Sequence, residues 1–190
     1  MKKSLEKFNE LVEAFASLPG VGKKSATRYA YHVSLTDSFG GLKLAQCIED
    51  AVRFIKRCDK CGNISEDEIC DICADDTRDC DLLAIVESPK DILVLESSKI
   101  FNGRYFVLDE LNDDLLDKLS LFIDENDVKE VIFAFTPGLN SDALMMFVED
   151  KLNKQNIRFS KIAQGVPTGV SLENIDMLSL LKALEARTKT

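Results

Sequence analysis

Four cysteines in two close pairs constrain this chain more than any other feature. The segment "CDKCGNISEDEICDIC" reads C-x2-C-x8-C-x2-C and places thiols at Cys58, Cys61, Cys70 and Cys73. Each C-x2-C pair forms a tight turn that offers two sulfurs, and two such pairs satisfy tetrahedral coordination. The spacing therefore predicts one zinc ion per chain, with an iron–sulfur cluster or a redox dithiol as the alternatives. Because four thiolates leave no open coordination position, we expect this zinc to be structural.

A basic stretch near the start of the chain is the second informative segment. "LPGVGKKSATRYAYHV", residues 18–33, contains three lysines and arginines and no carboxylate, although the whole chain has a formal net charge of -9. Residues 1–60 carry a net charge of +4, and the remaining residues carry -13. This asymmetry favours a polyanionic partner for the N-terminal third, with chance clustering on solvated faces as the alternative.

The basic stretch has the layout of a helix-hairpin-helix, in which a Gly-rich turn joins two helices. Glycines in such a turn allow backbone conformations and close approaches that side chains forbid. The free N–H groups that begin the second helix favour phosphate, and Lys24 and Arg28 lie four residues apart, on one helix face beside them. Such contacts read backbone charge and not base sequence. We therefore predict a DNA-binding site formed by Gly20, Gly22, Lys23, Lys24 and Arg28.

Two other interpretations of this stretch compete with DNA binding. The first is a tight helix–helix turn whose lysines are merely solvated. The second is a nucleotide-binding P-loop, which "GKKS" resembles. A P-loop requires a glycine where Ser17 stands, and it follows a strand, whereas an amphipathic helix is expected here. The P-loop is therefore excluded.

Hydrophobic periodicity predicts an α+β chain of several parts. Apolar spacing indicates helices at about residues 5–15, 23–31 and 42–55, with Cys47 on the core side of the third. After Arg78, short apolar runs typical of buried parallel strands alternate with helical patterns. The expected strands are 82–86, 105–108, 130–135 and 157–162, and the expected helices are 89–96, 115–123, 141–152 and 174–186. We expect domains at 1–56 (helix-hairpin-helix), 57–80 (zinc knuckle), 81–162 (parallel α/β sheet) and 163–190 (loop and C-terminal helix).

Two acidic residues near strand ends are candidates for a further site. Glu87 directly follows the first expected strand, where open α/β sheets place their sites, and Asp142 lies after the third. A magnesium phosphoryl-transfer centre needs further carboxylates at a neighbouring strand end, and "TPGLNSDAL" offers no Asp-x-Asp. We therefore expect Glu87 to act as a cap or hydrogen-bonding group.

The order of these segments resembles the RecR family of bacterial recombination mediators. The resemblance covers nearly the whole chain and rests on "LPGVGKKSATRYAYH", the cysteine segment with Arg78-Asp79, "AIVESPKDILVLE" and "AQGVPTGVSLENIDMLSLLKALEAR". It implies a Toprim fold for residues 81–162, no enzyme activity, and DNA contacts at Lys24 and Arg28. It further implies assembly into dimers or tetrameric rings, and action with RecO and/or RecF to help RecA load onto DNA covered by single-strand-binding protein.

The chain departs from this family's pattern around its acidic residues. Where the family has two glutamates in "NPTVEGEAT", Asn140 and Asp142 stand here, so that Glu87 and Asp142 form a candidate acidic site for partners. A Toprim-type magnesium nuclease or primase, and a protein adaptor without DNA contact, remain the alternative functions. No apolar run approaches the ~18 residues of a membrane span and no signal peptide is evident, so we expect a cytoplasmic protein without membrane association.

Overall fold

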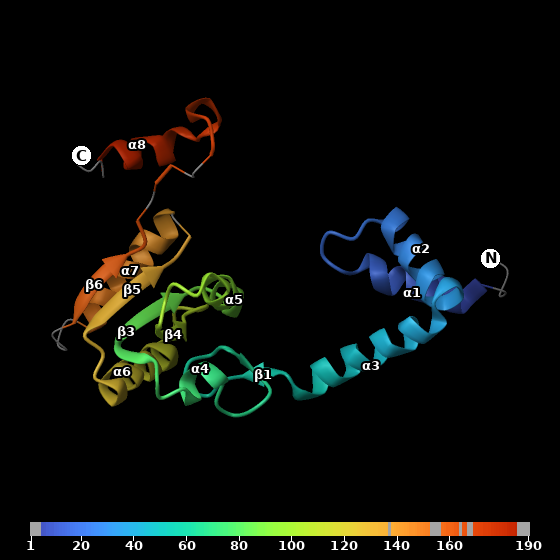
Figure 1. The fold of residues 1–190 in the computed structure, drawn as a ribbon, viewed down its shortest axis with the longest axis horizontal. Coiled ribbons are helices and arrows are strands. Elements are labelled where there is room, and N and C mark those ends of the chain that lie inside the picture. Colours follow the sequence, from blue (N-terminus) through green and yellow to red (C-terminus); the bar gives the residue numbers. More distant parts are fainter. Residues whose placement is uncertain (1–4, 137, 153–156, 164, 167–168, 186–190) are drawn as a thin grey trace. The chain divides into compact units, whose positions relative to one another are not determined.

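The computed structural model describes residues 5–136, 138–152, 157–163, 165–166 and 169–185. It divides into two compact units, Met1–Ile55 and Lys56–Thr190 (Figure 1). Each predicted helix and strand is found within the described residues, with ends that shift by a few positions. The predicted end of the last helix at Ala186 lies outside them.

The first unit is built on a pair of helices, α1 (Glu6–Ala16) and α2 (Lys23–Tyr31). Val12 of α1 is buried against Ala26 and Ala30 of α2, which are completely inaccessible to solvent. Because two alanines four residues apart form one row on a helix, the two backbones approach closely along that row. This row lies on the side of α2 opposite to Lys24 and Arg28, which are exposed.

A tight turn joins these two helices. The N–H group of Val21 donates to the carbonyl of Leu18 at 3.1 Å, with Pro19 and Gly20 as the central residues. Gly20 has a φ of 77°, which a type II turn requires at its third position, while proline suits the second. The sequence Leu-Pro-Gly-Val therefore fixes this turn through its local chemistry.

The third helix of this unit, α3 (Ser38–Phe54), follows a π-helical segment η2 (His32–Thr36). Asp37 caps α3 by accepting the N–H of Gly40, so the helix begins four residues before the predicted start. No residue of α3 is buried, and Ile48 and Val52 are 55% and 79% exposed. The prediction that Cys47 lies in a core is wrong, since it is exposed. The predicted helical periodicity was correct, but no described residue of the first unit covers that face.

The second unit begins with a small cysteine-rich module and continues into a parallel sheet. The module contains the antiparallel pair β1 (Lys56–Arg57) and β2 (Ile64–Ser65), followed by α4 (Asp71–Ala74). The sheet has the order β4-β3-β5-β6 with all neighbours parallel, as alternating strands and helices predict. Its elements are β3 (Asp79–Val86), α5 (Pro89–Ser98), β4 (Gly103–Val107), α6 (Asp113–Asn126), β5 (Glu130–Ala134), α7 (Leu139–Leu152) and β6 (Arg158–Lys161).

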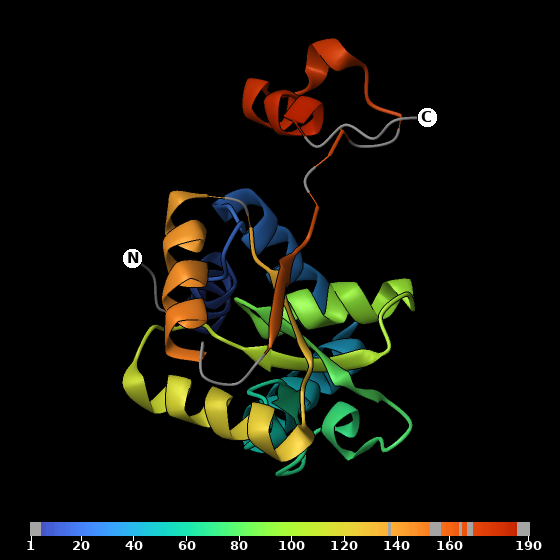
Figure 2. The ribbon, with the colours of Figure 1, turned by 90° about the vertical axis from the view of Figure 1, so that its left-hand side faces the viewer.

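Helices cover both faces of this sheet (Figures 1 and 2). On one face, residues of α6 and α7 pack with the four cysteines and with strand residues such as Phe106 and Phe133. On the other face, Ile92 of α5 packs with Tyr105 and Val107. The continuous apolar strands of the sequence are explained by this double coverage.

The C-terminal part contains η3 (Leu172–Asn174) and α8 (Met177–Glu185). Among the described helices, none is long and apolar enough to cross a membrane.

Candidate metal centre and nucleic-acid interface

The four predicted cysteine ligands come together at the start of the second unit. The sulfurs of Cys58, Cys61, Cys70 and Cys73 all lie within 4.8 Å of one another, and all four residues are buried. The Sγ atoms of Cys61 and Cys70 are 3.6 Å apart. Zn–S bonds of about 2.3 Å in a tetrahedron separate their sulfurs by roughly 3.8 Å, so the cluster fits one zinc ion.

The electrostatics of the cluster also favour a bound cation. The hydrogen bond with Cys70, together with burial, raises the pKa of the Cys61 thiol far above its usual value. The same hydrogen bond lowers the pKa of Cys70. Thiols packed this closely therefore cannot all ionise unless a metal ion offsets their charge. The N–H of Cys70 donates to Cys58 Sγ at 3.3 Å and orients that sulfur.

The cysteine module is attached directly to the sheet. The backbone N–H of Val107 in β4 donates to the carbonyl of Cys61 at 2.8 Å. Gly62 follows with a φ of 75°, and a Cβ at this position would approach Val107 Cβ at 3.2 Å. Arg57 donates to the Gly62 carbonyl and to Asp109, which follows β4. The four cysteines consequently belong to the same hydrophobic core as the sheet.

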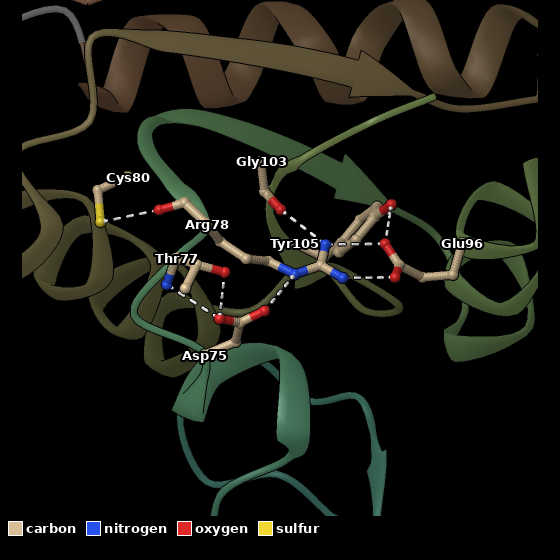
Figure 3. Close-up of polar contacts among 7 residues, drawn as sticks. All are labelled: Asp75, Thr77, Arg78, Cys80, Glu96, Gly103 and Tyr105. Carbon is tan, nitrogen blue, oxygen red and sulfur yellow. Dashed lines mark hydrogen bonds and ion pairs between the residues drawn. The ribbon is translucent and has the colours of Figure 1, made fainter. Parts of the chain in front are cut away.

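A partly buried ion pair fixes the other end of the module, where it enters β3 (Figure 3). Arg78 donates from both terminal nitrogens to the carboxylate of Glu96 in α5, at 2.8 and 2.5 Å. The hydroxyl of Tyr105 donates to the same carboxylate at 2.8 Å. Arg78 also donates to the carbonyl of Gly103, the first residue of β4, at 3.1 Å, and it lies 3.7 Å from Asp75.

This ion pair changes the titration of its members. The hydrogen bonds from Arg78 hold the pKa of Glu96 below its usual value. Burial, and then the hydrogen bond to the Glu96 carboxylate, raise the pKa of Tyr105. Arg78 remains charged and Tyr105 neutral at physiological pH, as the hydrogen-bond pattern requires.

The predicted DNA-binding residues lie together around the first turn of α2. Gly22 is the N-cap of this helix, no side chain caps it, and its first turn contains no acidic residue. A Cβ built at Gly20 or Gly22 would meet no atom within 4 Å, so the turn faces open space. The backbone N–H groups that begin α2 are therefore available to an anion.

The cations beside this turn are exposed and have no carboxylate partner. Within the described residues, no ion pair engages Lys23, Lys24 or Arg28. The Arg28 guanidinium lies over the ring of Tyr29, 5.5 Å from its centroid. Tyr29 in turn packs edge-on against Phe15 of α1, so Arg28 is held against the hairpin without losing its charge.

The two acidic residues singled out from the sequence have separate surroundings. Glu87 accepts the backbone N–H of Thr136 at 2.9 Å and so joins the ends of β3 and β5. The prediction that it forms a hydrogen bond is thus confirmed. Asp142 lies 3.9 Å from Lys161 at a cavity of about 500 Å³ lined also by Met145, Met146 and Phe159. The cysteine cluster is the sole grouping of three or more metal-binding side chains in the described part of the chain.

Sequence reasoning missed two arginines, Arg78, which is partly buried, and Arg104, which is buried. Arg78 stands out in the sequence only as part of a motif, and its partner Glu96 stands 18 residues away on another element. Arg104 is 6% exposed in the middle of β4, and its buried Nε atom has no hydrogen-bond partner among the described residues. A charged residue within the apolar run "GRYFV" was the available signal for Arg104.

Comparison with known proteins agrees with this architecture. Residues 8–52 match the family model of the RecR helix-hairpin-helix, and residues 55–75 match that of the RecR four-cysteine zinc finger domain. The recombination protein RecR of Campylobacter jejuni (strain 81-176) is 57% identical over 100% of both chains. The RecR proteins of a Nitratiruptor species and of Helicobacter pylori are 53% and 45% identical, over at least 97% of each chain. The chain therefore belongs to the RecR family of recombination proteins, and its four buried cysteines form the structural zinc site of that family.

Proposed function

We propose that this protein is a non-enzymatic DNA-binding mediator of recombinational repair in the cytoplasm. In this proposal it acts with RecO and/or RecF to help RecA load onto DNA covered by single-strand-binding protein. The observation that carries the proposal is the basic hairpin, defined as Gly20, Gly22, Lys23, Lys24 and Arg28. Membership of a family of recombination proteins supports DNA as its polyanion.

The geometry of the basic hairpin suits phosphate in two ways. Unpaired N–H groups at the start of α2 supply donors, and the exposed side chains of Lys24 and Arg28 add positive charge on one helix face. Neither feature can distinguish bases, so binding is expected to be independent of sequence. Three cations per chain bind weakly, and a repeated arrangement of chains strengthens binding through avidity.

Self-association is part of this proposal, and the exposed apolar face of α3 supports it. Ala45, Ile48 and Val52 recur at the spacing of three and four residues that two helices use to pack along a seam. A second copy that covers this face would bury the side chains that the isolated chain leaves in water. The proposed assembly is a dimer or a tetrameric ring.

Glu87 and Asp142 are proposed to serve partners and not catalysis. Glu87 already accepts a backbone N–H group, and Asp142 faces Lys161, which leaves neither in a carboxylate cluster suited to magnesium. Both apolar and charged side chains line the cavity beside Asp142, a mixture that also occurs in protein docking sites.

The deciding experiment is a salt titration of DNA binding by wild type and Lys24→Ala/Arg28→Ala. Each lost phosphate contact reduces the magnitude of the slope of log affinity against log salt by about 0.7 to 0.9. The double variant loses two contacts, so its slope should be smaller than that of wild type by roughly 1.4 to 1.8 for each chain bound to DNA. Lys90→Ala/Lys118→Ala removes two exposed charges from the second unit and is the matched control. It should bind nearly as wild type does.

Zinc content and oligomer size are measured on the same samples. An intact double variant with the wild-type affinity and slope would show that the basic hairpin is not the DNA site. DNA cleavage or primer synthesis that requires Mg²⁺ and disappears in Glu87→Gln would show that the protein is an enzyme instead.

A further inference from the structure

We infer that the zinc site is a metal-dependent lock on the outer edge of the sheet. When the metal is lost, the end of β4 beside Cys61 opens, while the sheet and the opposite end of β4 remain closed. This inference concerns the second unit and does not depend on DNA binding.

The starting observation is the burial of β4. This strand is the last in the order β4-β3-β5-β6, yet every residue from Gly103 to Val107 is buried. An edge strand ordinarily presents a row of unpaired N–H and C=O groups to solvent, where they can pair with another chain. Here the cysteine module contributes a backbone hydrogen bond to the outer side of β4, and Arg78, which follows the module, contributes a second hydrogen bond.

One end of the edge is closed by the zinc ligand Cys61. Directly after β4, the N–H of Leu108 donates to the carbonyl of Val86 in the neighbouring strand β3, so the N–H of Val107 points to the outer side. The carbonyl of Cys61 accepts that outward N–H at 2.8 Å. Gly62 lies directly against the Val107 side chain. Cys61 is thus both a predicted metal ligand, through its sulfur, and the hydrogen-bond acceptor for the outer side of β4, through its carbonyl.

The other end of the edge is closed without the metal. Arg78 donates to the outward carbonyl of Gly103, and it is held in place by Glu96, itself bonded to Tyr105 (Figure 3). None of these groups binds the metal. The two closures are therefore made by different groups, one by the metal ligand Cys61 and the other by a partly buried ion pair.

Metal binding can control the hydrogen bond between Cys61 and Val107 because the cysteine module needs the metal in order to fold. The module has two two-residue strands and one four-residue helix, which are too short to persist alone. In such modules the free energy of metal binding is the free energy of folding. The sheet, in contrast, retains helices on both faces when the metal leaves.

Amide hydrogen exchange resolved by NMR tests the inference directly, in zinc-loaded protein and after zinc removal by a chelator. The Val107 amide should exchange at least about tenfold faster without zinc, since it loses its hydrogen-bond acceptor. The Leu108 amide, adjacent in sequence but bonded inside the sheet, should change by less than a factor of about two, as should Phe133 in β5.

A pair of variants repeats the test without a chelator. Cys73→Ser removes a ligand of the other cysteine pair and should accelerate exchange at Val107, whereas Cys80→Ser removes a thiol outside the cluster and should not. Arg78→Met should leave zinc content and Val107 unchanged. Equal acceleration at Val107, Leu108 and Phe133 would mean that zinc loss unfolds the whole sheet and would refute the lock. Unchanged protection of Val107 in metal-free protein would refute it as well.

Discussion

Replacing Glu96 by leucine should destabilise the second unit far more than its position on the surface of α5 suggests. The Arg78 side chain is 12% exposed and that of Glu96 is 30% exposed, so water can only partly replace what each loses. In Glu96→Leu the Arg78 guanidinium keeps its hydrogen bond to the Gly103 carbonyl but loses both hydrogen bonds to the carboxylate. Removing one partner of a buried ion pair costs about 3 to 5 kcal/mol, and the partial exposure of Glu96 places this case near about 3 kcal/mol.

The reverse variant should cost less. In Arg78→Met the Glu96 carboxylate still accepts from the Tyr105 hydroxyl and is reached by solvent, so we expect a loss of about 1.5 kcal/mol. The double variant Arg78→Met/Glu96→Leu contains no buried charge at this place and should lose about 2 kcal/mol. That loss is well below the sum of the single changes.

Urea unfolding of zinc-saturated protein, followed by circular dichroism at neutral pH, measures all three free energies. The denaturant slope should stay at the wild-type value, which shows that the midpoint shift reports stability. Additive losses, or a Glu96→Leu variant within about 0.5 kcal/mol of wild type, would contradict the assignment of this ion pair as a buried and coupled interaction.

Three further predictions concern the metal site, the hairpin turn and the pH dependence of stability. Purified protein should contain about one zinc per chain by metal analysis, and Cys61→Ser should lose the zinc and misassemble while its sheet stays folded, whereas metal-free protein of normal assembly would contradict a structural zinc. Gly20→Ala should lower stability by about 1 kcal/mol because its φ of 77° is strained for alanine, whereas Gly22→Ala should fold normally and weaken DNA binding alone. Because the folded pKa of Glu96 is lowered, its stabilisation is complete above its unfolded pKa of about 4.3. The stability gap between wild type and Glu96→Gln should therefore stay constant above about pH 5 and narrow as the pH falls through the folded pKa.

Local signals in the sequence were sufficient for much of this fold. The type II turn at Leu18–Val21 follows from Pro-Gly, and "ESPKD" forms a capping box in which Ser88 and Asp91 bond each other's backbone at the start of α5. The cysteine spacing predicted the metal cluster because ligand geometry is encoded within 16 residues. Continuous apolar runs predicted the buried parallel strands, because this signal also lies within a short segment of the sequence.

Contacts between distant segments could not be predicted in this way. Helical periodicity identifies an apolar face on α3 but does not say what covers it, so the assignment of Cys47 to a core was wrong. The attachment of Cys61 to Val107 and the pairing of Arg78 with Glu96 depend on the strand order and on crossovers. No spacing rule specifies either of them. Both DNA and partner contacts remain predictions from the exposed residues.

The short connection between α1 and α2 determines which part of the chain folds first. The hairpin needs only a six-residue closure and contacts between residues that are near in sequence, such as Val12 and Ala26. Local contacts of this kind form in microseconds to milliseconds, whereas synthesis adds about 5 to 20 residues per second. The hairpin can therefore acquire its structure once it has left the ribosome, before the four cysteines have emerged. The parallel sheet, in contrast, must wait for β5, about 100 residues later. A ribosome-bound chain arrested at this stage would already present a folded basic hairpin while it still lacked its metal site.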